Sequence, residues 1–463
     1  MFMTEEYALR NVPIDEHATV MKLRFMVQTG GPLASFFQSI GTQAAIVLIN
    51  LVTGVLTARL LGAEGRGIFA AVTVWPQMFA LVAISGIGNA VVFRLNKSPA
   101  AAPQIVTATL LSGVIASMVA VAIGVCVMPF ALRRYDADTV LLAQLCLGSV
   151  FINALQMLIK QSYAGLGAFG WFSIANLSSQ LAYLLCLLVL VIFVPLTAKL
   201  AILALVGSSV LGLLVLLPSF VRLARPRLKG VRREFPSLLS YSWRSAGFDL
   251  ITALSNNADR LILIPLLAAK SLGLYAVAYS FSRLIQLALP AIASVLFSTM
   301  TSLSRAEAKL LHDRTYRFMF ATLTIGCIGM WIAGPFIMRL VYGEEFAPAA
   351  TIFRILVLEA ALGVLTQVTI QLFMSLDRPG IISSIQAIVM VATLIALFFL
   401  VPAMGTLGAA TGLLLAAVLR LVLLYGAVRG TLKFEWPRPY LNRSDFDYLR
   451  SRFGIGIEKV RAR

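Results

Sequence analysis

Long apolar runs, separated by short polar segments, fill most of the sequence after residue 34. Each run is near or beyond the ~20 residues that a helix needs to cross a bilayer. Runs of this length predict membrane-spanning helices rather than amphipathic surface helices. The pattern predicts about twelve spans, six in each half: approximately 35–60, 68–93, 104–131, 139–160, 171–194 and 198–221, then 237–267, 272–297, 316–342, 350–374, 380–402 and 407–428.

The two halves of the chain share a sequence pattern. In residues 60–72 and 266–278, an apolar run passes through a short loop with one basic residue to Gly, an aromatic residue and Ala. A second match aligns residues 161–176 with 371–386. Internal duplication in an apolar chain is typical of transporters, in which the substrate path lies between the repeats. We therefore predict an all-α membrane protein with two six-helix lobes related by a parallel internal repeat.

Positive charge is concentrated in alternate loops and at the C-terminus, which predicts that both termini are cytoplasmic. The loop after the sixth span carries the largest group: Arg222, Arg225, Arg227, Lys229, Arg232 and Arg233. An even number of spans per half gives both lobes the same orientation. The predicted division is a cytoplasmic N-terminal segment (1–34), an N-terminal lobe (35–222), a basic cytoplasmic linker (223–236), a C-terminal lobe (237–428) and a basic cytoplasmic tail (429–463).

Composition supports a membrane protein, because 59% of the residues are hydrophobic and only 13% are charged. The net charge of +18 does not indicate nucleic-acid binding here, since loop topology and anionic lipid head groups account for it. No apolar core followed by a cleavage site opens the sequence, so no signal peptide is expected, and Met21 is an alternative start to Met1.

The sequence offers little for catalysis. Its two histidines, His17 and His312, lie in or beside cytoplasmic segments, and no outward loop is long enough to form a catalytic domain. Residues 165–170 match Gly-x-Gly-x-x-Gly but join two apolar runs without a βαβ unit, so a tight turn is favoured over a dinucleotide site. We expect no enzyme activity, no cofactor and no metal site.

Polar residues inside the spans are the candidate functional residues, because each is costly in hydrocarbon. In the seventh span, Asp249, Asn256 and Arg260 share one helical face. In the eighth, Tyr275, Tyr279, Arg283 and Gln286 do the same, and Arg283 is the better ligand candidate because it lies deeper. The alternative is an internal ion pair with Asp249 or Asp259, and pairing of Asp249 with Arg283 is favoured over a role for Asp249 in ion coupling. Glu359 in the tenth span is a weaker candidate.

The repeat aligns cations of the second half with neutral residues of the first. Asn50 corresponds to Asn256, Gly54 to Arg260 and Gln77 to Arg283. Further amides in the first half, Asn176 and Gln180 among them, either hold helices together or line a path for hydroxyl-rich cargo. Cations on one wall and amides and aromatics on the other suit a molecule with an anionic head and sugars.

Three segments carry a family resemblance: residues 58–67 (ARLLGAEGRG), 258–261 (ADRL) leading to 272–279 (LGLYAVAY), and 340–346 (LVYGEEF). With twelve spans, they resemble the polysaccharide-biosynthesis flippases of the multidrug/oligosaccharidyl-lipid/polysaccharide exporter superfamily, over residues 35–428. The resemblance implies two lobes around a V-shaped cavity and transport of undecaprenyl-pyrophosphate-linked oligosaccharide across the bacterial inner membrane. It also implies that cavity arginines meet the pyrophosphate, while the polyprenyl tail stays among membrane lipids.

Three alternatives remain. An ion-coupled multidrug exporter of the same fold would favour acidic groups in the cavity, and Asp249, Asp259 and Glu359 keep this possibility open. A membrane-embedded glycan polymerase or ligase is disfavoured by the short outward loops. A scaffold could recruit glycosyltransferases through the basic linker and tail; a glycan polymerase and glycosyltransferases are also the expected protein partners of a flippase.

Overall fold

The computed structural model describes residues 32–287, 289–437 and 440, and their regular secondary structure is entirely helical. The all-α prediction is thus confirmed. In chain order the helices are α2 (Pro32–Ala83), α3 (Ile87–Lys97), η1 (Pro99–Ala101), α4 (Ala102–Ala131), α5 (Ala137–Cys146), α6 (Ser149–Gly165), α7 (Phe169–Phe193), α8 (Ala198–Ala224), α9 (Val231–Leu266), α10 (Ala269–Ser282), η2 (Arg283–Gln286), α11 (Leu289–Thr301), α12 (Arg305–Tyr342), η3 (Glu344–Phe346), α13 (Ala349–Ser375) and α14 (Pro379–Gly430).

The longest two helices, α2 and α14, are each interrupted by a glycine with a positive φ. Gly62 has φ 67° and ψ −178°, and Gly405 has φ 60° and ψ −132°. A Cβ on Gly408 would lie 1.9 Å from the Leu400 carbonyl oxygen, so the chain folds back sharply at Gly405. Only glycine adopts such backbone angles at little cost, and each glycine therefore divides one long helix into two.

Eight helical stretches of the described chain are long and apolar enough to cross a membrane. Dividing α2 and α14 at their glycines adds two. The seventh and eighth predicted spans correspond to α9, which carries several charged residues, and to α10, η2 and α11, which are separate short helices. Charge in one case and interruption in the other explain why these two differ from the remaining spans.

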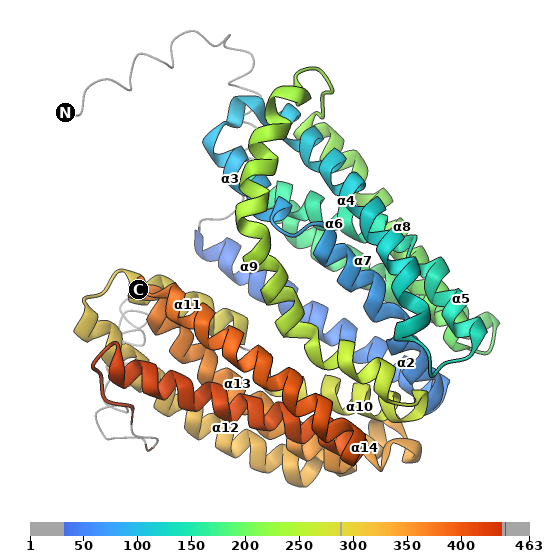
Figure 1. The fold of residues 1–463 in the computed structure, drawn as a ribbon, viewed down its shortest axis with the longest axis vertical. Helices are drawn as coiled ribbons and strands as arrows, with labels where there is room; N and C mark the ends of the chain where they lie inside the picture. The colour runs from blue at the N-terminus through green and yellow to red at the C-terminus, as the bar shows by residue number, and fades with distance from the viewer. Residues whose placement is uncertain (1–31, 288, 438–439, 441–463) are drawn as a thin grey trace, which may run out of the picture.

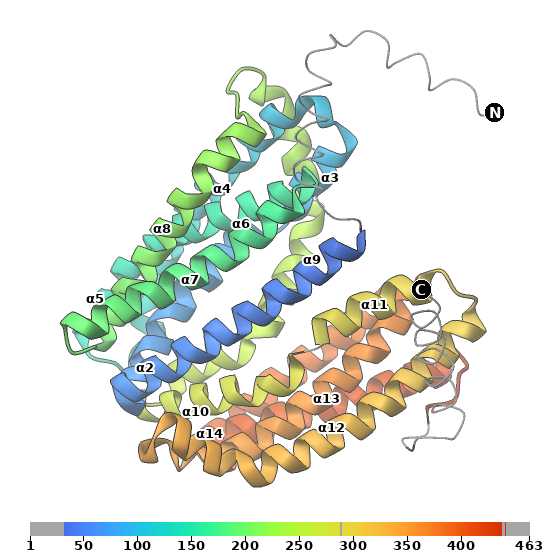
Figure 2. The same ribbon diagram turned by 180° about the vertical axis from the view of Figure 1, so that it is seen from behind.

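Two groups of helices form two lobes (Figures 1 and 2): α2 to α8 in one, α10 to α14 in the other. The lobes meet where α2 contacts α10, and their ribbons diverge toward the opposite end. Helix α9 contacts α3 and α4 of the first lobe and α14 of the second. It begins at Val231, inside the segment 223–236 that was predicted as a linker.

The contact between α2 and α10 is made by two glycines. A Cβ on Gly67 would lie 1.7 Å from the carbonyl oxygen of Ala269, and a Cβ on Gly273 would lie 1.8 Å from that of Ala63. Small residues at a helix crossing in a membrane let backbones touch. Gly67 and Gly273, like Ala63 and Ala269, are positions that the predicted repeat aligns. The two aligned segments therefore pack against each other reciprocally, although the duplication itself stays a prediction.

Candidate functional site

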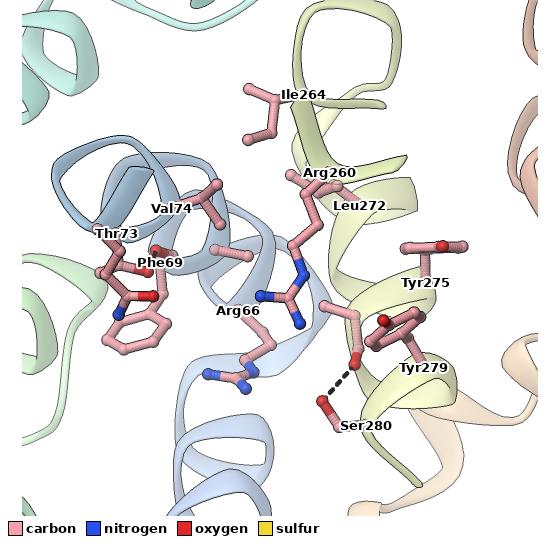
Figure 3. Close-up of a pocket in the computed structure, with 13 residues that line it drawn as sticks. Arg66, Phe69, Thr73, Val74, Arg260, Ile264, Leu272, Tyr275, Tyr279 and Ser280 are labelled. Carbon is pink, nitrogen blue, oxygen red and sulfur yellow. Dashed lines mark hydrogen bonds between the residues drawn. The ribbon is translucent and has the colours of Figure 1, made fainter. Parts of the chain in front are cut away.

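A cavity of about 190 Å³ lies beside this crossing, between the two lobes (Figure 3). Its walls come from α2, α9 and α10, and its lining mixes cations, hydroxyls, an amide, aromatic rings and aliphatic groups: Arg66, Phe69, Ala70, Thr73, Val74, Gln77, Arg260, Ile264, Leu272, Tyr275, Ala276, Tyr279 and Ser280. Gln77 and Ser280 are exposed, so the cavity communicates with the exterior.

Two guanidinium groups reach into the cavity from different helices. Arg66 belongs to α2 and Arg260 to α9, and Figure 3 shows both in the space between these helices and α10. Arg66 lies 5.1 Å from the ring centroid of Phe69, and Arg260 lies 5.2 Å from that of Tyr279. Within the described part of the chain neither has an ion pair or a hydrogen bond. Two uncompensated cations beside aromatic rings make the cavity suited to an anion.

Arg283 lies behind Tyr279, outside the lining of the cavity. Its guanidinium lies 4.2 Å from the Tyr279 ring centroid, and its Nη2 is 2.7 Å from Oε2 of Glu359 on α13. Next to it, Nε2 of Gln286 donates to the Ala360 carbonyl at 2.9 Å. Arg283 is thus neutralised within the C-terminal lobe, and Tyr279 separates it from the cavity space.

The predicted ion pair between Asp249 and Arg283 is wrong. The Asp249 carboxylate accepts hydrogen bonds from the Gly86 N–H at 2.9 Å and from Nδ2 of Asn89, also at 2.9 Å. Gly86 has φ 77° and immediately precedes α3, so Asp249 binds an N–H at the start of that helix. This position offers peptide N–H groups that lack an intrahelical partner and favours negative charge, which accounts for a carboxylate in α9 at this depth.

The other predicted site residues lie in different surroundings. Asp259 is 5% exposed and accepts a hydrogen bond from the Tyr275 hydroxyl at 3.1 Å. Asn50 is exposed, and Asn176 and Gln180 are half-buried; these three are not part of the cavity lining. The side chain of Asn256 lies outside the described residues. Of the predicted set, the cavity brings together Arg260, Tyr279 and Gln77.

The end of the molecule beside Gly62 is held closed by two contacts between the lobes. Oε1 of Glu345, in η3, accepts a hydrogen bond from the Ala63 N–H at 3.0 Å. The donor of the second contact is also on α2: the Arg59 guanidinium donates to the carbonyls of Leu340 and Val341, with 2.6 Å from Nε to the latter. Each side chain satisfies peptide groups near a helix end of the opposite lobe.

A family model for polysaccharide biosynthesis proteins matches residues 33–304, which is more than half of the chain. The chain belongs to the polysaccharide biosynthesis protein family. No curated protein sequence matches it at a significant level.

Solved structures with the same fold are transporters of the MOP superfamily and a flippase. The lipid II flippase MurJ, in an inward closed conformation, matches with a TM-score of 0.71 and 12% identity over 86% of this chain and 87% of MurJ. A multidrug resistance MATE family transporter of the MOP superfamily, in an inward-facing conformation, matches with a TM-score of 0.66 and 14% identity over 84% of this chain and 98% of that one. A MOP superfamily transporter from Pyrococcus furiosus, described as having a binding pocket of reverse polarity, matches with a TM-score of 0.61 and 15% identity over 88% and 98%. At these identities the likeness concerns the fold.

Several lining residues of this family member's cavity fall on positions that the predicted repeat aligns. In the register that aligns Gly67 with Gly273, five lining residues of α2 correspond to five lining residues of α10: Arg66 with Leu272, Phe69 with Tyr275, Ala70 with Ala276, Thr73 with Tyr279 and Val74 with Ser280. Ala70 and Ala276 are identical and Phe69 and Tyr275 are both aromatic, whereas the other three pairs differ in chemistry.

Sequence reasoning missed Arg66. The second predicted span begins at residue 68, which left Arg66 in an outward loop, whereas the turn is confined to Gly62 and the helix resumes at Ala63. Arg66 is therefore one turn inside the helix. The signal that could have found it was its place next to Gly67 in the repeated motif, since a residue beside a helix crossing faces the space between the lobes.

Proposed function

We propose that the chain is a flippase that moves an undecaprenyl-pyrophosphate-linked oligosaccharide across the bacterial inner membrane by alternating access. The observation that carries this proposal is the pair of free guanidinium groups, Arg66 and Arg260, in a cavity between two lobes. Membership of the polysaccharide biosynthesis protein family and the transporter fold support it.

The pyrophosphate is the part of the cargo that requires such a site. It carries two phosphoryl groups, and each of the two arginines can offer parallel N–H donors to phosphate oxygens. Because Arg66 lies on α2 and Arg260 on α9, a ligand that binds both joins these two helices across the cavity. The polyprenyl tail is a hydrocarbon, so it gains nothing from the charged cavity and remains in the lipid.

The direction of opening follows from the Lys and Arg distribution. With the termini in the cytoplasm, the end that holds Gly62 and η3 faces outward, and the cavity of this conformation is accessible from the cytoplasmic side. This is the state that a flippase needs to accept a lipid-linked glycan from the inner leaflet. The basic cytoplasmic segments then contact anionic lipids and remain available to glycosyltransferases; no nucleic acid is involved.

An exporter of organic cations is the second candidate, and the carboxylates argue against it. Asp249 is engaged by Gly86 and Asn89, Asp259 by Tyr275, and Glu359 by Arg283. None of the three lines the cavity. A cationic drug in this cavity would meet two free cations and no free carboxylate in the described lining.

The test is export in cells that lack the native gene and produce the Arg66→Gln, Arg260→Gln double variant. We expect normal protein abundance, loss of surface glycan and accumulation of the lipid-linked glycan in the inner leaflet. Arg354→Gln is the matched control, because Arg354 is likewise a helical arginine beside an aromatic ring, with its guanidinium 4.5 Å from the Trp331 ring centroid, but it does not line the cavity. Wild-type export by the double variant would refute the proposal, and export of organic cations by the wild-type protein would favour the drug exporter.

A further inference from the structure

A smaller pocket of about 40 Å³ adjoins the cavity and shares Thr73 and Gln77 with it. It lies within the N-terminal lobe, between α2, the α5–α6 segment and α8, and its lining contains no charged residue: Thr73, Pro76, Gln77, Cys146, Ser149, Asn153, Ile202, Leu205, Val206 and Ser209. Five of these ten residues carry a neutral hydroxyl or amide. Divalent and transition-metal sites in proteins are usually built on carboxylate, imidazole or thiolate ligands, and the described residues contain no group of three or more such side chains that could hold a metal ion.

The hydroxyl protons of the pocket are already donated in hydrogen bonds within the protein. Thr73 donates to the Phe69 carbonyl at 2.7 Å, Ser149 to the Cys146 carbonyl at 2.7 Å and Ser209 to the Leu205 carbonyl at 3.0 Å. A hydroxyl oxygen has one proton and two acceptor lone pairs. The oxygens of Thr73 and Ser209 therefore remain available as acceptors, and that of Ser149 keeps one lone pair beside the Asn153 amide, which fits a ligand that brings its own O–H donors.

The two amides supply the complementary groups. Nδ2 of Asn153 lies 3.5 Å from the Ser149 hydroxyl, which leaves its second N–H and its carbonyl oxygen available. Gln77 is exposed and makes no hydrogen bond within the described chain, so its whole amide is available. Gln156 holds the opposite wall in place, since its Nε2 donates to the Ser209 carbonyl and its Oε1 accepts from the Ser179 hydroxyl at 3.3 Å.

The geometry points to this pocket as the site that binds the hydroxyl groups of the cargo's first sugar. This inference rests on the proposed function and assigns the pyrophosphate to the cavity arginines and the first sugar to the smaller pocket. The pocket has room for roughly three water-sized groups, which suits one edge of a pyranose ring rather than the whole ring. Arg66, Thr73 and Gln77 lie on one face of α2, and Thr73 is about 10 Å along the helix from Arg66, so the sugar pocket and the cavity arginine follow one another along the same helix.

The experiment compares two ligands on purified full-length protein: undecaprenyl pyrophosphate, and the same lipid carrying one N-acetylhexosamine. For the wild-type protein we expect tighter binding of the glycosylated lipid. The Asn153→Leu, Ser209→Ala double variant should lose about tenfold in affinity for the glycosylated lipid, since two neutral hydrogen bonds are removed, and keep its affinity for the bare lipid. Retained binding of the bare lipid also shows that the variant is folded.

Ser208→Ala is the matched control. Ser208 donates to the same Leu205 carbonyl, at 2.8 Å, but it is 1% exposed and does not line the pocket, so its removal should leave both affinities unchanged. Gln77→Ala gives a second variant at an exposed position, where loss of packing is small, and it should also weaken only the glycosylated lipid.

The outcomes separate the two proposals. If both pocket variants bind both lipids as the wild-type protein does, or if the sugar adds no affinity to the wild-type protein, the pocket is not the sugar site. If the wild-type protein binds neither lipid, or if Arg66→Gln, Arg260→Gln leaves both affinities intact, the proposed function itself fails.

Discussion

Replacing Gly67 by alanine should open the end of the molecule that is closed in this structure. The new Cβ would lie 1.7 Å from the Ala269 carbonyl oxygen, 2.5 Å from its carbon and 3.0 Å from the Gly273 nitrogen. All three atoms belong to the backbone, so no side chain can rotate away. Ordinary contact begins near 3.4 Å, and the two helices would have to separate by about 1.7 Å at this point.

The added methyl group of Gly67→Ala destabilises only the closed conformation. Forcing a methyl group into a packed contact typically costs about 1–3 kcal/mol. If the two helices part when the lobes move, the alternative conformation does not carry this cost. A difference of 1.4 kcal/mol is tenfold in a population, so we expect the closed form to decrease by about tenfold or more relative to the open form.

The assay is the labelling rate of a cysteine at position 73, measured with a membrane-impermeant maleimide added from outside, in a protein whose four cysteines are replaced. Thr73 lines the cavity, so the reagent reaches it only when the closed end opens. Gly67→Ala should raise the rate several-fold. Gly54→Ala is the control, because nothing lies within 4 Å of its added Cβ on the same α2. Equal rates in Gly67→Ala, Gly273→Ala and wild type would refute the reasoning.

Two further predictions concern contacts between and within the lobes. Glu345→Gln and Arg59→Gln each weaken a hydrogen-bonded contact across the closed end, and because both side chains are exposed we expect only about a threefold rise in the rate of labelling from outside. The nearby exposed Glu344→Gln should leave this rate unchanged. An unchanged rate in both variants would mean that these contacts do not hold the end closed. Arg283→Gln and Glu359→Gln each leave a partly buried charge without its partner and should lower stability by about 2 kcal/mol, measured as loss of folded protein on heating. The double variant should recover most of this loss; a double variant no more stable than either single one would mean that the pair does not interact as a unit.

The helical class could be predicted because it depends on apolar runs, and each run of about 20 residues is long enough to identify a span. The exact turns were harder. At Gly62 the chain reverses within one residue, so the expected loop is absent and the following helix contains Arg66. A hydrophobicity pattern averages over many residues and cannot resolve a single-residue turn, which is why this arginine was assigned to the outside.

The partners of the charged residues could not be predicted, because they lie on helices distant in sequence. Arg283 was expected to meet Asp249 from its estimated depth, yet α10 ends at Ser282 and Arg283 starts a short 3-10 segment directed to Glu359 on α13. Asp249 instead accepts a hydrogen bond from the Gly86 N–H at the start of α3, a peptide group that has no acceptor within that helix. Spacing within one helix identifies residues that share a face, but the opposing helix decides what that face contacts.

Among the positions that the predicted repeat aligns, the glycines at the helix crossing affect movement of the lobes, and the cavity residues affect recognition of the cargo. Gly67 and Gly273 are the same residue in both halves, and their reciprocal contact with the opposite backbone needs only the absence of a side chain. The neighbouring cavity positions differ in chemistry, since Arg66 faces Leu272 in the alignment and Thr73 faces Tyr279. A cavity with equal walls could bind a cargo in two opposite orientations, whereas one in which Arg66 is matched by Leu272 and Thr73 by Tyr279 has unlike walls at these positions and favours a single orientation. A cargo with an anionic end and a hydroxylated end needs such an asymmetric cavity, so substitutions at the glycines should change how often the lobes open, and substitutions at Arg66 or Thr73 should change what is carried.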